Sequence, residues 1–509
     1  MANQTSEPTK MPDPTTSDGG SPDDAAASDA AADAAASDAA ADAAASDAAS
    51  DAAASLHPYR DRFDRYDRMP PKGRDRADIL DEMRAMRADE ESRWADGFAS
   101  GSVYHGDPEH IAFLNEAYAI NSQANPLHAD LWPSVVKFEA EIVAMTADMV
   151  GGGPDGVDTV CGSVSSGGTD SILLAMKVYR DRGRLNGVTQ PNLVVPTSAH
   201  AAFEKACQYF AMELRKVPVA ADGRADVEAM IAAVDDSTIA LVGSAPCFPT
   251  GLIDPIEELA AAAAERGIGF HTDCCLGGFL LPWAERLGYP VPPFDFRVPG
   301  VTSLSCDTHK YGYAAKGTSV VLYRTPELRH LQYYTTASWA GGLYYSPTFA
   351  GSRPGALSAA CWAAMVSLGE EGYLDAASQI LETAAAVKAG VALIDGLEVV
   401  GDPLWNVAIR STDPEVNIYA VLEQMGHRRW SLNGLLDPPS LHLCTTLRHT
   451  ADGVIERFLA DLGASVDAVR SDPDQADGLI PVYGLASMAE TQDLVAGGLL
   501  SYVDGLYEV

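Results

Sequence analysis

Residues 303–313 read SLSCDTHKYGY, a short apolar stretch that runs into Asp307, His309 and Lys310. A lysine that forms an imine has to lie at the end of a rigid element and be shielded enough to lose its proton. If residues 303–306 form a strand, Lys310 meets the first condition. Taken alone, the His309–Lys310 pair is weak evidence, because most lysines are solvated surface groups.

A second apolar stretch lies upstream and ends in an acidic residue, since residues 268–278 read IGFHTDCCLGG. At the carboxyl end of a parallel strand, Asp273 would point into the crevice in which such sheets bind ligands. A carboxylate there could keep a pyridine nitrogen protonated, which pyridoxal 5'-phosphate (PLP) requires in order to act as an electron sink. The simpler alternative is that Asp273 caps a helix.

Further upstream, a turn rich in glycine and hydroxyl side chains, SVSSGGTDS at residues 163–171, leads into an amphipathic helix. Such a turn offers free backbone N–H groups and the positive end of a helix dipole to a phosphate. His200, in PTSAHAAFEKA, could stack on a pyridine ring or could cap the next helix. A phosphate cup, Asp273 and Lys310, in that order on one α/β pattern, predict a PLP site.

The surrounding sequence alternates short apolar strands with amphipathic helices, which is typical of a mostly parallel, doubly wound sheet. We predict strands at 192–196, 239–244, 267–272 and 320–323, and helices at 171–182 and 227–234. From about residue 354 the pattern turns helical and then gives short strands near 397–409 and 441–444. This second pattern indicates a smaller α+β domain.

The chain therefore divides into four predicted parts. They are an Ala/Asp-rich tail (1–55), an N-terminal helical segment (56–120), a large PLP-binding domain (121–350) and a small C-terminal domain with its tail (351–509). From residue 23 to 55 the tail is almost only Ala, Asp and Ser, with dense like charge and nothing bulky to bury. We expect it to be disordered or transiently helical, and an interaction tail is the alternative.

Composition excludes several classes of function. The chain has 509 residues, a net charge of -36 and eight cysteines. So acidic a surface repels nucleic acid and anionic membranes. The cysteines have no CxxC spacing and are too few for a disulfide framework, which favours reduced thiols in a cytoplasmic protein without a metal site. No apolar run of about 18 residues and no signal-type N-terminus occur, so we expect neither a membrane span nor secretion.

Together these segments resemble the sphingosine-1-phosphate lyase branch of the PLP-dependent group II decarboxylase superfamily, over roughly residues 105–450. The most specific stretch is FDFRVPGVTSLSCDTHKYGYAAKGTSVVLY, at residues 294–323. Supporting stretches are NPLHADLWPSVVKFEAE (125–141), SSGGTDSILLA (165–175), SAPCFPTGLIDPI (244–256) and GGLYYSPTFAGSRPG (341–355). The resemblance implies a fold-type I, aspartate aminotransferase-like α/β architecture and a homodimer with the active site at the subunit interface.

The resemblance also implies roles for the cofactor-binding residues. Lys310 would form the Schiff base with PLP, Asp273 would pair the ring nitrogen, and His200 would stack on the ring. The remaining cofactor-binding positions would be Gly168 and Thr169 at the phosphate, together with His309, Asn125 and Ser352. Ser352 would approach the phosphate from the neighbouring subunit.

On the substrate side, the resemblance implies that Tyr104, His128 and Lys316 grip a substrate phosphate and that Tyr483 closes the pocket. Lys316 separates a lyase from a decarboxylase, because a phosphate with nearly two negative charges favours a lysine and a tyrosine hydroxyl. A solvated surface lysine is the alternative. Phe248, in CFPTG, stands where relatives often carry a tyrosine, which would lower the rate or shift the substrate if that hydroxyl helps catalysis.

The implied reaction is retro-aldol cleavage of a phosphorylated long-chain amino alcohol to a fatty aldehyde and phosphoethanolamine. Lys310 or His128 could transfer the proton, and the residues leave this choice open. Two alternatives remain: a PLP-dependent L-amino-acid decarboxylase on the same fold, and a catalytically silent scaffold. Chain length of the substrate also stays open.

Overall fold

The computed structural model describes residues 57–472, 480–486 and 491–509. The chain splits into two compact units, one made of residues 1–86 with 488–509 and the other of residues 87–487. Each unit is described by itself below. The Ala/Asp tail predicted for residues 1–55 lies outside the described residues, and the four predicted domain limits stay predictions.

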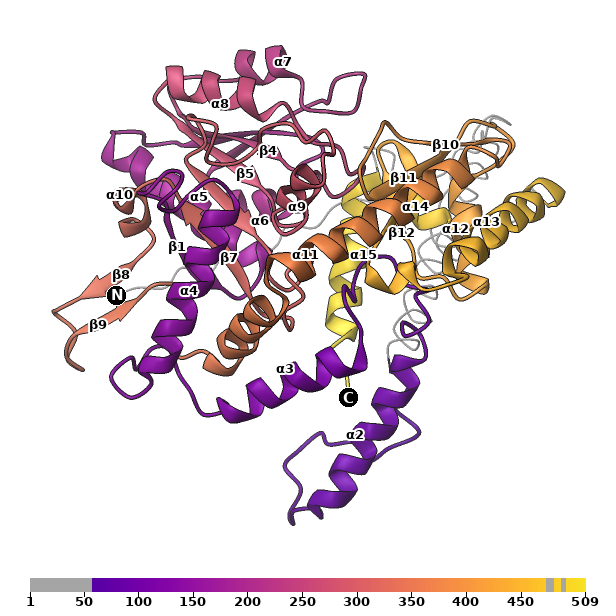
Figure 1. The fold of residues 1–509 in the computed structure, drawn as a ribbon, viewed down its shortest axis with the longest axis horizontal. Coiled ribbons are helices and arrows are strands. Elements are labelled where there is room, and N and C mark those ends of the chain that lie inside the picture. The colour runs from indigo at the N-terminus through magenta and orange to yellow at the C-terminus, as the bar shows by residue number, and fades with distance from the viewer. Residues whose placement is uncertain (1–56, 473–479, 487–490) are drawn as a thin grey trace, which may run out of the picture. The chain divides into compact units, whose positions relative to one another are not determined.

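A seven-stranded sheet forms the centre of the larger unit, in the order β1-β7-β6-β5-β4-β2-β3 (Figure 1). Its strands are β1 (Cys161–Ser165), β2 (Asn192–Pro196), β3 (Glu213–Val217), β4 (Thr238–Ser244), β5 (Gly269–Asp273), β6 (Ser303–Cys306) and β7 (Ser319–Tyr323). Only β7 is antiparallel to its neighbours, so the other strands run in one direction. This arrangement confirms the predicted mostly parallel sheet.

Helices cover both faces of this sheet, because successive side chains of a strand point to opposite faces. On β2, Leu193 and Val195 join the core under α5 and α6, whereas Val194 joins the core that includes α8. The helices of this part are α3 (Pro108–Ile120), α4 (Pro133–Met149), α5 (Gly168–Leu185), α6 (Ala202–Phe210), α7 (Val227–Ala232), α8 (Ile256–Glu265), α9 (Leu281–Arg286) and α10 (Pro326–His330). Burial on both faces explains why these strands read as continuous apolar runs.

A second, antiparallel sheet has the order β10-β11-β13-β12. Its strands are β10 (Leu397–Val399), β11 (Asn406–Ser411), β12 (Asn433–Leu436) and β13 (Pro439–Cys444). The helices that follow or flank them are α11 (Gly355–Val391), α12 (Ile418–His427), the short 3-10 helix Leu447–Thr450, α13 (Val454–Ser471) and α14 (Ile480–Ala486). Strands and helices together form the α+β region expected after residue 354.

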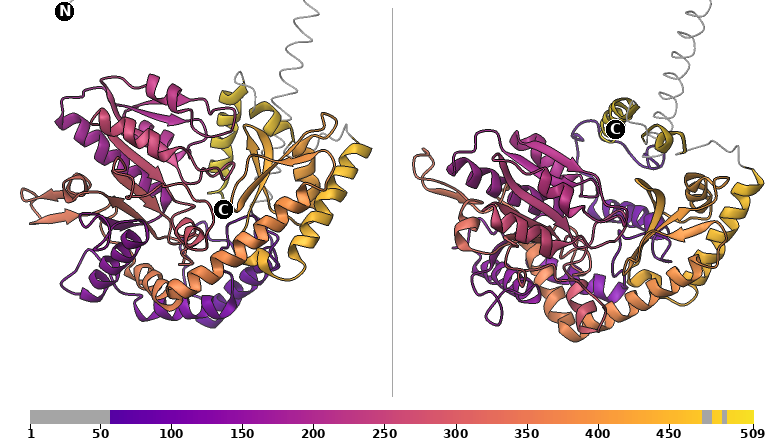
Figure 2. Two further views of the ribbon diagram at one scale, coloured as in Figure 1. Left: turned by 45° about the horizontal axis from the view of Figure 1, so that its top comes forward. Right: turned by 90° about the horizontal axis from the view of Figure 1, so that it is seen from above.

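The long helix α11 connects the two sheets, as Figure 2 shows. Along its length it packs against α3, α4 and α9 and then against α13 and β11. Gly369 interrupts the helix with φ of 58°, a conformation that glycine adopts without steric cost. One continuous element therefore ties the second sheet to the first.

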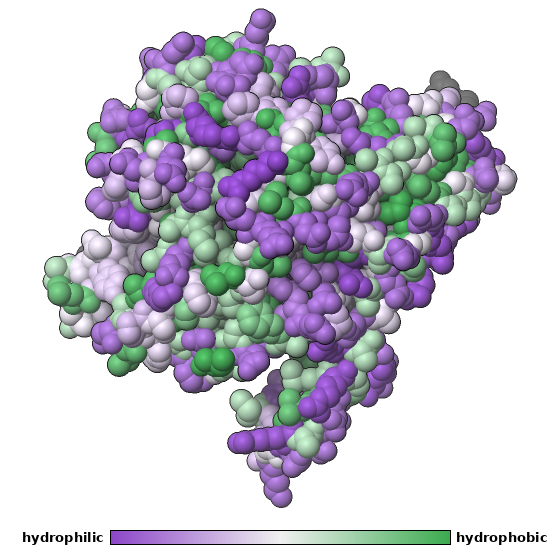
Figure 3. Space-filling model, viewed as in Figure 1, coloured by the Kyte–Doolittle hydropathy of each residue, from purple (hydrophilic) through white to green (hydrophobic). Residues whose placement is uncertain are grey.

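The larger unit also carries an exposed hairpin of β8 (Tyr334–Thr336) and β9 (Tyr344–Ser346). Elsewhere, on the face shown in Figure 3, hydrophilic residues predominate and hydrophobic ones are scattered between them. Such a surface agrees with the strongly acidic composition. All eight cysteines are free thiols, seven of them buried.

The smaller unit contains most of α2 (Arg76–Glu91) and all of α15 (Gln492–Gly505). Its N-terminal and C-terminal parts meet where the His57 ring contacts the Gly505 carbonyl oxygen at 2.7 Å. An ion pair of 2.6 Å joins Arg74 to Glu82 within it. Across the described part of the chain, no helix combines the length and the apolarity of a membrane span.

Candidate active site

The turn that carries Lys310 is rigid because its own backbone closes it. It leaves β6 and returns through hydrogen bonds from the Tyr313 N–H to the Lys310 carbonyl and from the Ala314 N–H to the Thr308 carbonyl, both 3.0 Å. Tyr313 has φ of 57°, a costly value for a bulky residue. Two outside contacts support it: His110 bonds the Tyr313 carbonyl at 2.8 Å, and the Tyr373 ring stacks on the Tyr313 ring.

Lys310 is paired in this turn with Asp307, which the sequence reasoning left without a role. The Lys310 Nζ lies 3.0 Å from Asp307 Oδ2. Burial alone would lower the pKa of Lys310, but the charge and hydrogen bond of Asp307, together with Cys275 and Tyr104, outweigh it and hold that pKa above its usual value. Lys310 is therefore a cation in this pair, and the pair has to open before Lys310 can act as a nucleophile.

The predicted phosphate cup is the N-terminus of α5. It faces the carboxylate of Asp307. No side chain caps this helix, so its first backbone N–H groups have no partner within the helix. A Cβ on Gly168 would lie 2.7 Å from Asp307 Oδ2 and 2.8 Å from Cys275 Sγ. Only glycine fits here, and Thr169 follows it on an exposed position of the first turn.

His309 completes this side of the site. Its Nδ1 lies 2.5 Å from the Thr318 carbonyl oxygen, and its Nε2 lies 3.7 Å from Asp307 Oδ2. Burial lowers the pKa of His309. The imidazole Cε1 is also the nearest atom to a Cβ placed on Gly167, at 3.7 Å. The fold thus brings Gly168, His309 and Lys310 to one place.

Asp273 ends β5, as predicted, and the hydrogen bonds that it accepts from the described residues fall on one oxygen, Oδ1. Asp273 Oδ1 accepts hydrogen bonds from the Cys275 N–H at 3.0 Å and from the Ser305 hydroxyl at 3.2 Å. Burial by itself would raise the pKa of Asp273, but His200 and the Cys275 N–H bring it below its usual value. The other oxygen, Oδ2, is left for a ligand, and His200 lies exposed after β2.

A second cation, Lys316, follows the turn that carries Lys310. We call that turn, which leaves β6 and closes at Ala314, the lysine turn. Its Nζ lies 4.7 Å from the centre of the Tyr104 ring and 3.4 Å from the His309 carbonyl oxygen. Burial and the charge of Lys310 lower the pKa of Lys316 to about 8. Asp307 pairs directly with Lys310, and among the described residues no carboxylate lies within ion-pair distance of Lys316, which leaves this end of the site positively charged.

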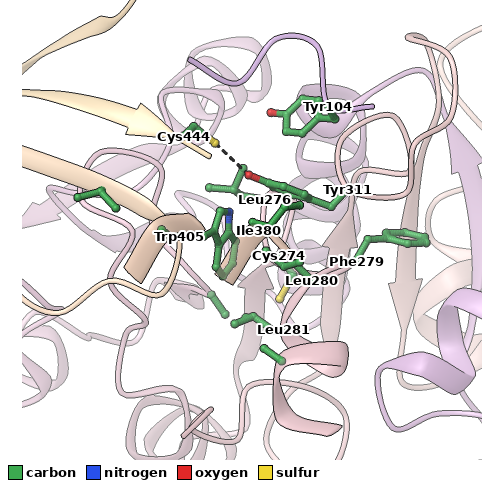
Figure 4. Packing of buried hydrophobic residues seen from close by; sticks show 14 of the residues in the cluster. Tyr104, Cys274, Leu276, Phe279, Leu280, Leu281, Tyr311, Ile380, Trp405 and Cys444 are labelled. Carbon is green, nitrogen blue, oxygen red and sulfur yellow. Dashed lines mark hydrogen bonds between the residues drawn. The ribbon is translucent and has the colours of Figure 1, made fainter. Parts of the chain in front are cut away.

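Tyr104 is held in place by the second sheet. Its ring meets the Tyr311 ring edge to face at 4.9 Å. The Tyr311 hydroxyl donates to the Thr445 carbonyl at 2.6 Å and lies 3.2 Å from Cys444 Sγ, at the end of β13 (Figure 4). Only 8% of Tyr104 is exposed, and burial raises its pKa. No local pattern predicts this support, because residues 311 and 444 are far apart in the chain.

Other predicted residues lie apart from the lysine turn. Asn125 Nδ2 donates to Ser352 Oγ at 3.1 Å, and the exposed His128 ring contacts Trp132. Among the residues described, no hydrogen bond, ion pair or ring contact joins Asn125, His128 or Ser352 to Tyr104, Asp307, Lys310 or Lys316. We call the group of Asn125, His128 and Ser352 the loop cluster.

Two residues predicted to bear on the pocket contact the second sheet and the helix that flanks it. The Tyr483 ring, on α14, stacks on Tyr419 of α12 with centroids 4.8 Å apart. Phe248 meets the His442 ring edge to face at 4.8 Å, and 38% of Phe248 is exposed. The closing role of Tyr483 and the effect of Phe248 on activity stay predictions.

The residues present fit PLP. A phosphate suits the uncapped N-terminus of α5 beside Gly168, and a pyridinium nitrogen suits the free oxygen of Asp273. Lys310 supplies the amine between them. Asp307 Oδ1 is buried without a hydrogen-bond partner among the residues described, as expected of a site that awaits a ligand.

Comparison with known proteins agrees with this site. The pyridoxal-dependent decarboxylase conserved domain matches residues 101–407. A sphingosine-1-phosphate lyase from Arabidopsis thaliana is 47% identical over 417 residues, which are 81% of this chain and 76% of the relative.

Two solved structures agree as well. The structure of a Burkholderia pseudomallei sphingosine-1-phosphate lyase superposes with a TM-score of 0.79 at 44% identity, covering 85% of this chain and all of that one. A Lactobacillus brevis glutamate decarboxylase superposes with a TM-score of 0.68 at 20% identity, covering 83% of this chain and 99% of that one. At that identity the decarboxylase shares the fold and carries no argument about the reaction.

Proposed function

Since the chain belongs to the sphingosine-1-phosphate lyase family, we propose that it is a PLP-dependent carbon–carbon lyase that cleaves sphingosine-1-phosphate or a related long-chain base phosphate. The products are a fatty aldehyde and phosphoethanolamine. The observation that carries the choice of substrate is a second cation, Lys316, which lies against the Tyr104 ring close to the Lys310–Asp307 ion pair. A site of this charge favours a phosphorylated amine.

Bound PLP supplies a sink for the electron pair released when the bond between C2 and C3 of the substrate breaks. Lys310 would hold the cofactor through its amine. Asp273 keeps the ring nitrogen protonated through Oδ2, and Gly168 and Thr169 hold the cofactor phosphate. His200 covers the face of the ring.

The substrate phosphate is held at the other end by Lys316 and the Tyr104 hydroxyl. Cleavage removes the proton of the C3 hydroxyl, which becomes the aldehyde, and returns one proton to C2, so that atoms and charge balance without a further reactant. Lys310 would be one candidate base for this transfer. His128 is the alternative base, and it lies in the loop cluster.

The loop cluster supports a homodimer. Asn125, His128 and Ser352 contact one another's loops but not the lysine turn of their own chain. A second copy would deliver them to that turn. The hairpin β8–β9 and the loop that follows it expose large apolar side chains suited to such an interface, namely Tyr334, Trp339, Leu343, Tyr345 and Phe349. Tyr483 would close the same pocket over the bound substrate.

We also place the enzyme in the cytoplasm. The support is the set of eight free thiols, which a reducing compartment preserves. An amphiphilic substrate would then reach the site from a carrier or from a bilayer surface.

Purified holoenzyme tests the reaction directly. Incubated with a long-chain base phosphate, it should release fatty aldehyde and phosphoethanolamine in equal amounts. The decarboxylase alternative predicts carbon dioxide from an amino acid and no aldehyde. A chain-length series of amino alcohol phosphates identifies the preferred substrate. Each compound is paired with its unphosphorylated analogue, and equal rates within every pair would overturn the proposal that Lys316 and Tyr104 bind the substrate phosphate.

A further inference from the structure

A chain of buried polar groups reaches Asp273 along the face of the sheet that α5 and α6 cover. The Tyr179 hydroxyl, on α5, lies 2.6 Å from Ser303 Oγ, which lies 2.7 Å from His271 Nδ1. His271 Nε2 lies 3.3 Å from Ser305 Oγ, and that hydroxyl donates to Asp273 Oδ1. Tyr179, Ser303, His271 and Ser305 are all fully buried. We call this set, ending at Asp273, the relay.

The number of protons fixes the direction of every hydrogen bond in the relay. Ser305 has one proton, and the charged Asp273 carboxylate is its strongest acceptor. Ser305 therefore accepts from His271, which must carry its proton on Nε2. Complete burial lowers the pKa of His271 to about 4, so the ring is neutral and its Nδ1 is an acceptor.

The same reasoning orders the rest of the relay. Ser303 donates to His271 Nδ1 and so accepts from the Tyr179 hydroxyl. The Tyr179 hydroxyl also lies 2.7 Å from Thr302 Oγ1 and 3.0 Å from the Phe270 carbonyl oxygen, and Thr302 donates to that carbonyl. From Tyr179 inward, each group donates toward Asp273, and hydrogen bonds aligned in one direction polarise one another in a buried site.

The alignment also decides which oxygen of Asp273 meets a ligand. Ser305 and the Cys275 N–H both occupy Oδ1. A carboxylate anchored through one oxygen cannot rotate freely, so Oδ2 keeps one direction. Fixing a charged group through its neighbours is how outer residues orient the groups that touch a cofactor.

We propose that the relay holds Asp273 ionised and aims its Oδ2 at the ring nitrogen of the cofactor, which makes His271 and Ser305 positioning residues of this enzyme. The inference rests on the proposed function, since it takes Asp273 as the partner of that nitrogen. It extends the site along this face of the sheet to Tyr179, a residue outside the crevice.

Nuclear magnetic resonance of histidine labelled with nitrogen-15 tests the direction of the relay. In wild-type holoenzyme, His271 should give the shifts of the neutral Nε2–H form from pH 6 to pH 8, identified by their loss in His271→Gln. Tyr179→Phe removes the outermost donor and should shift the His271 signals. A charged ring or the Nδ1–H form in the wild type would overturn the inference.

Cofactor binding tests the purpose of the relay. Ser305→Ala removes one hydrogen bond to a charged group and should weaken PLP binding about 10-fold. It should also alter the pH dependence of the visible absorbance of the bound cofactor. Tyr179→Phe should change the PLP affinity and this pH dependence in the same direction as Ser305→Ala does, but by a smaller amount. Ser440→Ala is the control, because it removes an equally buried hydroxyl from β13, where the hydroxyl bonds only Pro438.

These measurements use no substrate, so they separate the two claims. If the holoenzyme releases no aldehyde while the variants still change cofactor binding, the proposed substrate is wrong and the relay stands. If the enzyme cleaves the substrate but Ser305→Ala and Tyr179→Phe bind PLP as tightly as Ser440→Ala does, the relay has no positioning role.

Discussion

The carboxyl edge of the large sheet and the loop cluster contribute to one predicted site, yet they are built differently. At the sheet edge, Asp273, Asp307 and Lys310 already contact their partners within one chain. In the loop cluster, Asn125 and Ser352 bond each other and face no cofactor-binding group of their own chain. Strand register therefore completes the first region within one chain, whereas we propose that a second copy brings the other region to it.

The largest expected effect comes from breaking the sheet edge. Lys310→Ala removes the amine that holds PLP and exchanges with the substrate, so activity should fall at least about 1000-fold, as for loss of a covalent catalyst. Turnover and the visible absorbance of the cofactor measure it. Lys205→Ala, on the exposed face of α6, is the control and should keep both.

Mixing two inactive variants tests whether the loop cluster acts across the interface. Lys310→Ala damages one region, and a double variant of Asn125→Ala with Ser352→Ala damages the other. When equal amounts are unfolded and refolded together, hybrid dimers should each regain one intact site and restore about one quarter of wild-type activity. No recovery, with hybrids shown to form, would place both regions in one subunit.

A change at Lys316 separates binding of the substrate phosphate from binding of the cofactor. Lys316→Ala should raise KM for a phosphorylated substrate about 10-fold to 100-fold, the value of one or more charge-assisted hydrogen bonds. PLP binding should be unaffected. An equal rise in KM for the unphosphorylated analogue would contradict the grip, and Lys205→Ala is again the matched surface control.

The smallest expected effect is a pH dependence. The pKa of Lys316 is lowered to about 8, so Lys316 is charged below that pH and neutral above it. The substrate phosphate is a dianion above about pH 6. The ratio kcat/KM for the phosphorylated substrate should therefore fall several-fold as pH rises through about 8, and this limb should disappear in Lys316→Ala.

Much of the fold could be predicted from the sequence. The predicted strand 192–196 coincides with β2, and the predicted ends at Ser244 and Tyr323 are those of β4 and β7. Apolar runs bounded by turn residues are local signals, so they locate strands well. Part of the site follows from the same signals, because Asp273 and the lysine turn both stand directly after strands.

The rest of the site could not be predicted in this way. The pairing of Lys310 with Asp307 was missed, although both stand in SLSCDTHK, because an acidic residue beside a lysine is too common to be informative. Tyr311 and Cys444 meet through the packing of two sheets. His271 looked like part of an ordinary apolar strand until its two serine partners were placed beside it.

The sequence by itself determined that an α/β sheet carries a phosphate cup, an acidic strand end and a lysine turn in the order of a PLP enzyme. Only the tertiary structure decided which oxygen of Asp273 is free, why the pKa values of Lys310 and Lys316 shift in opposite directions, and that Asn125 and Ser352 lie together. Strand ends and turns depend on neighbours in the chain. Charge coupling and hydrogen-bond direction depend on distances between residues that only folding brings together.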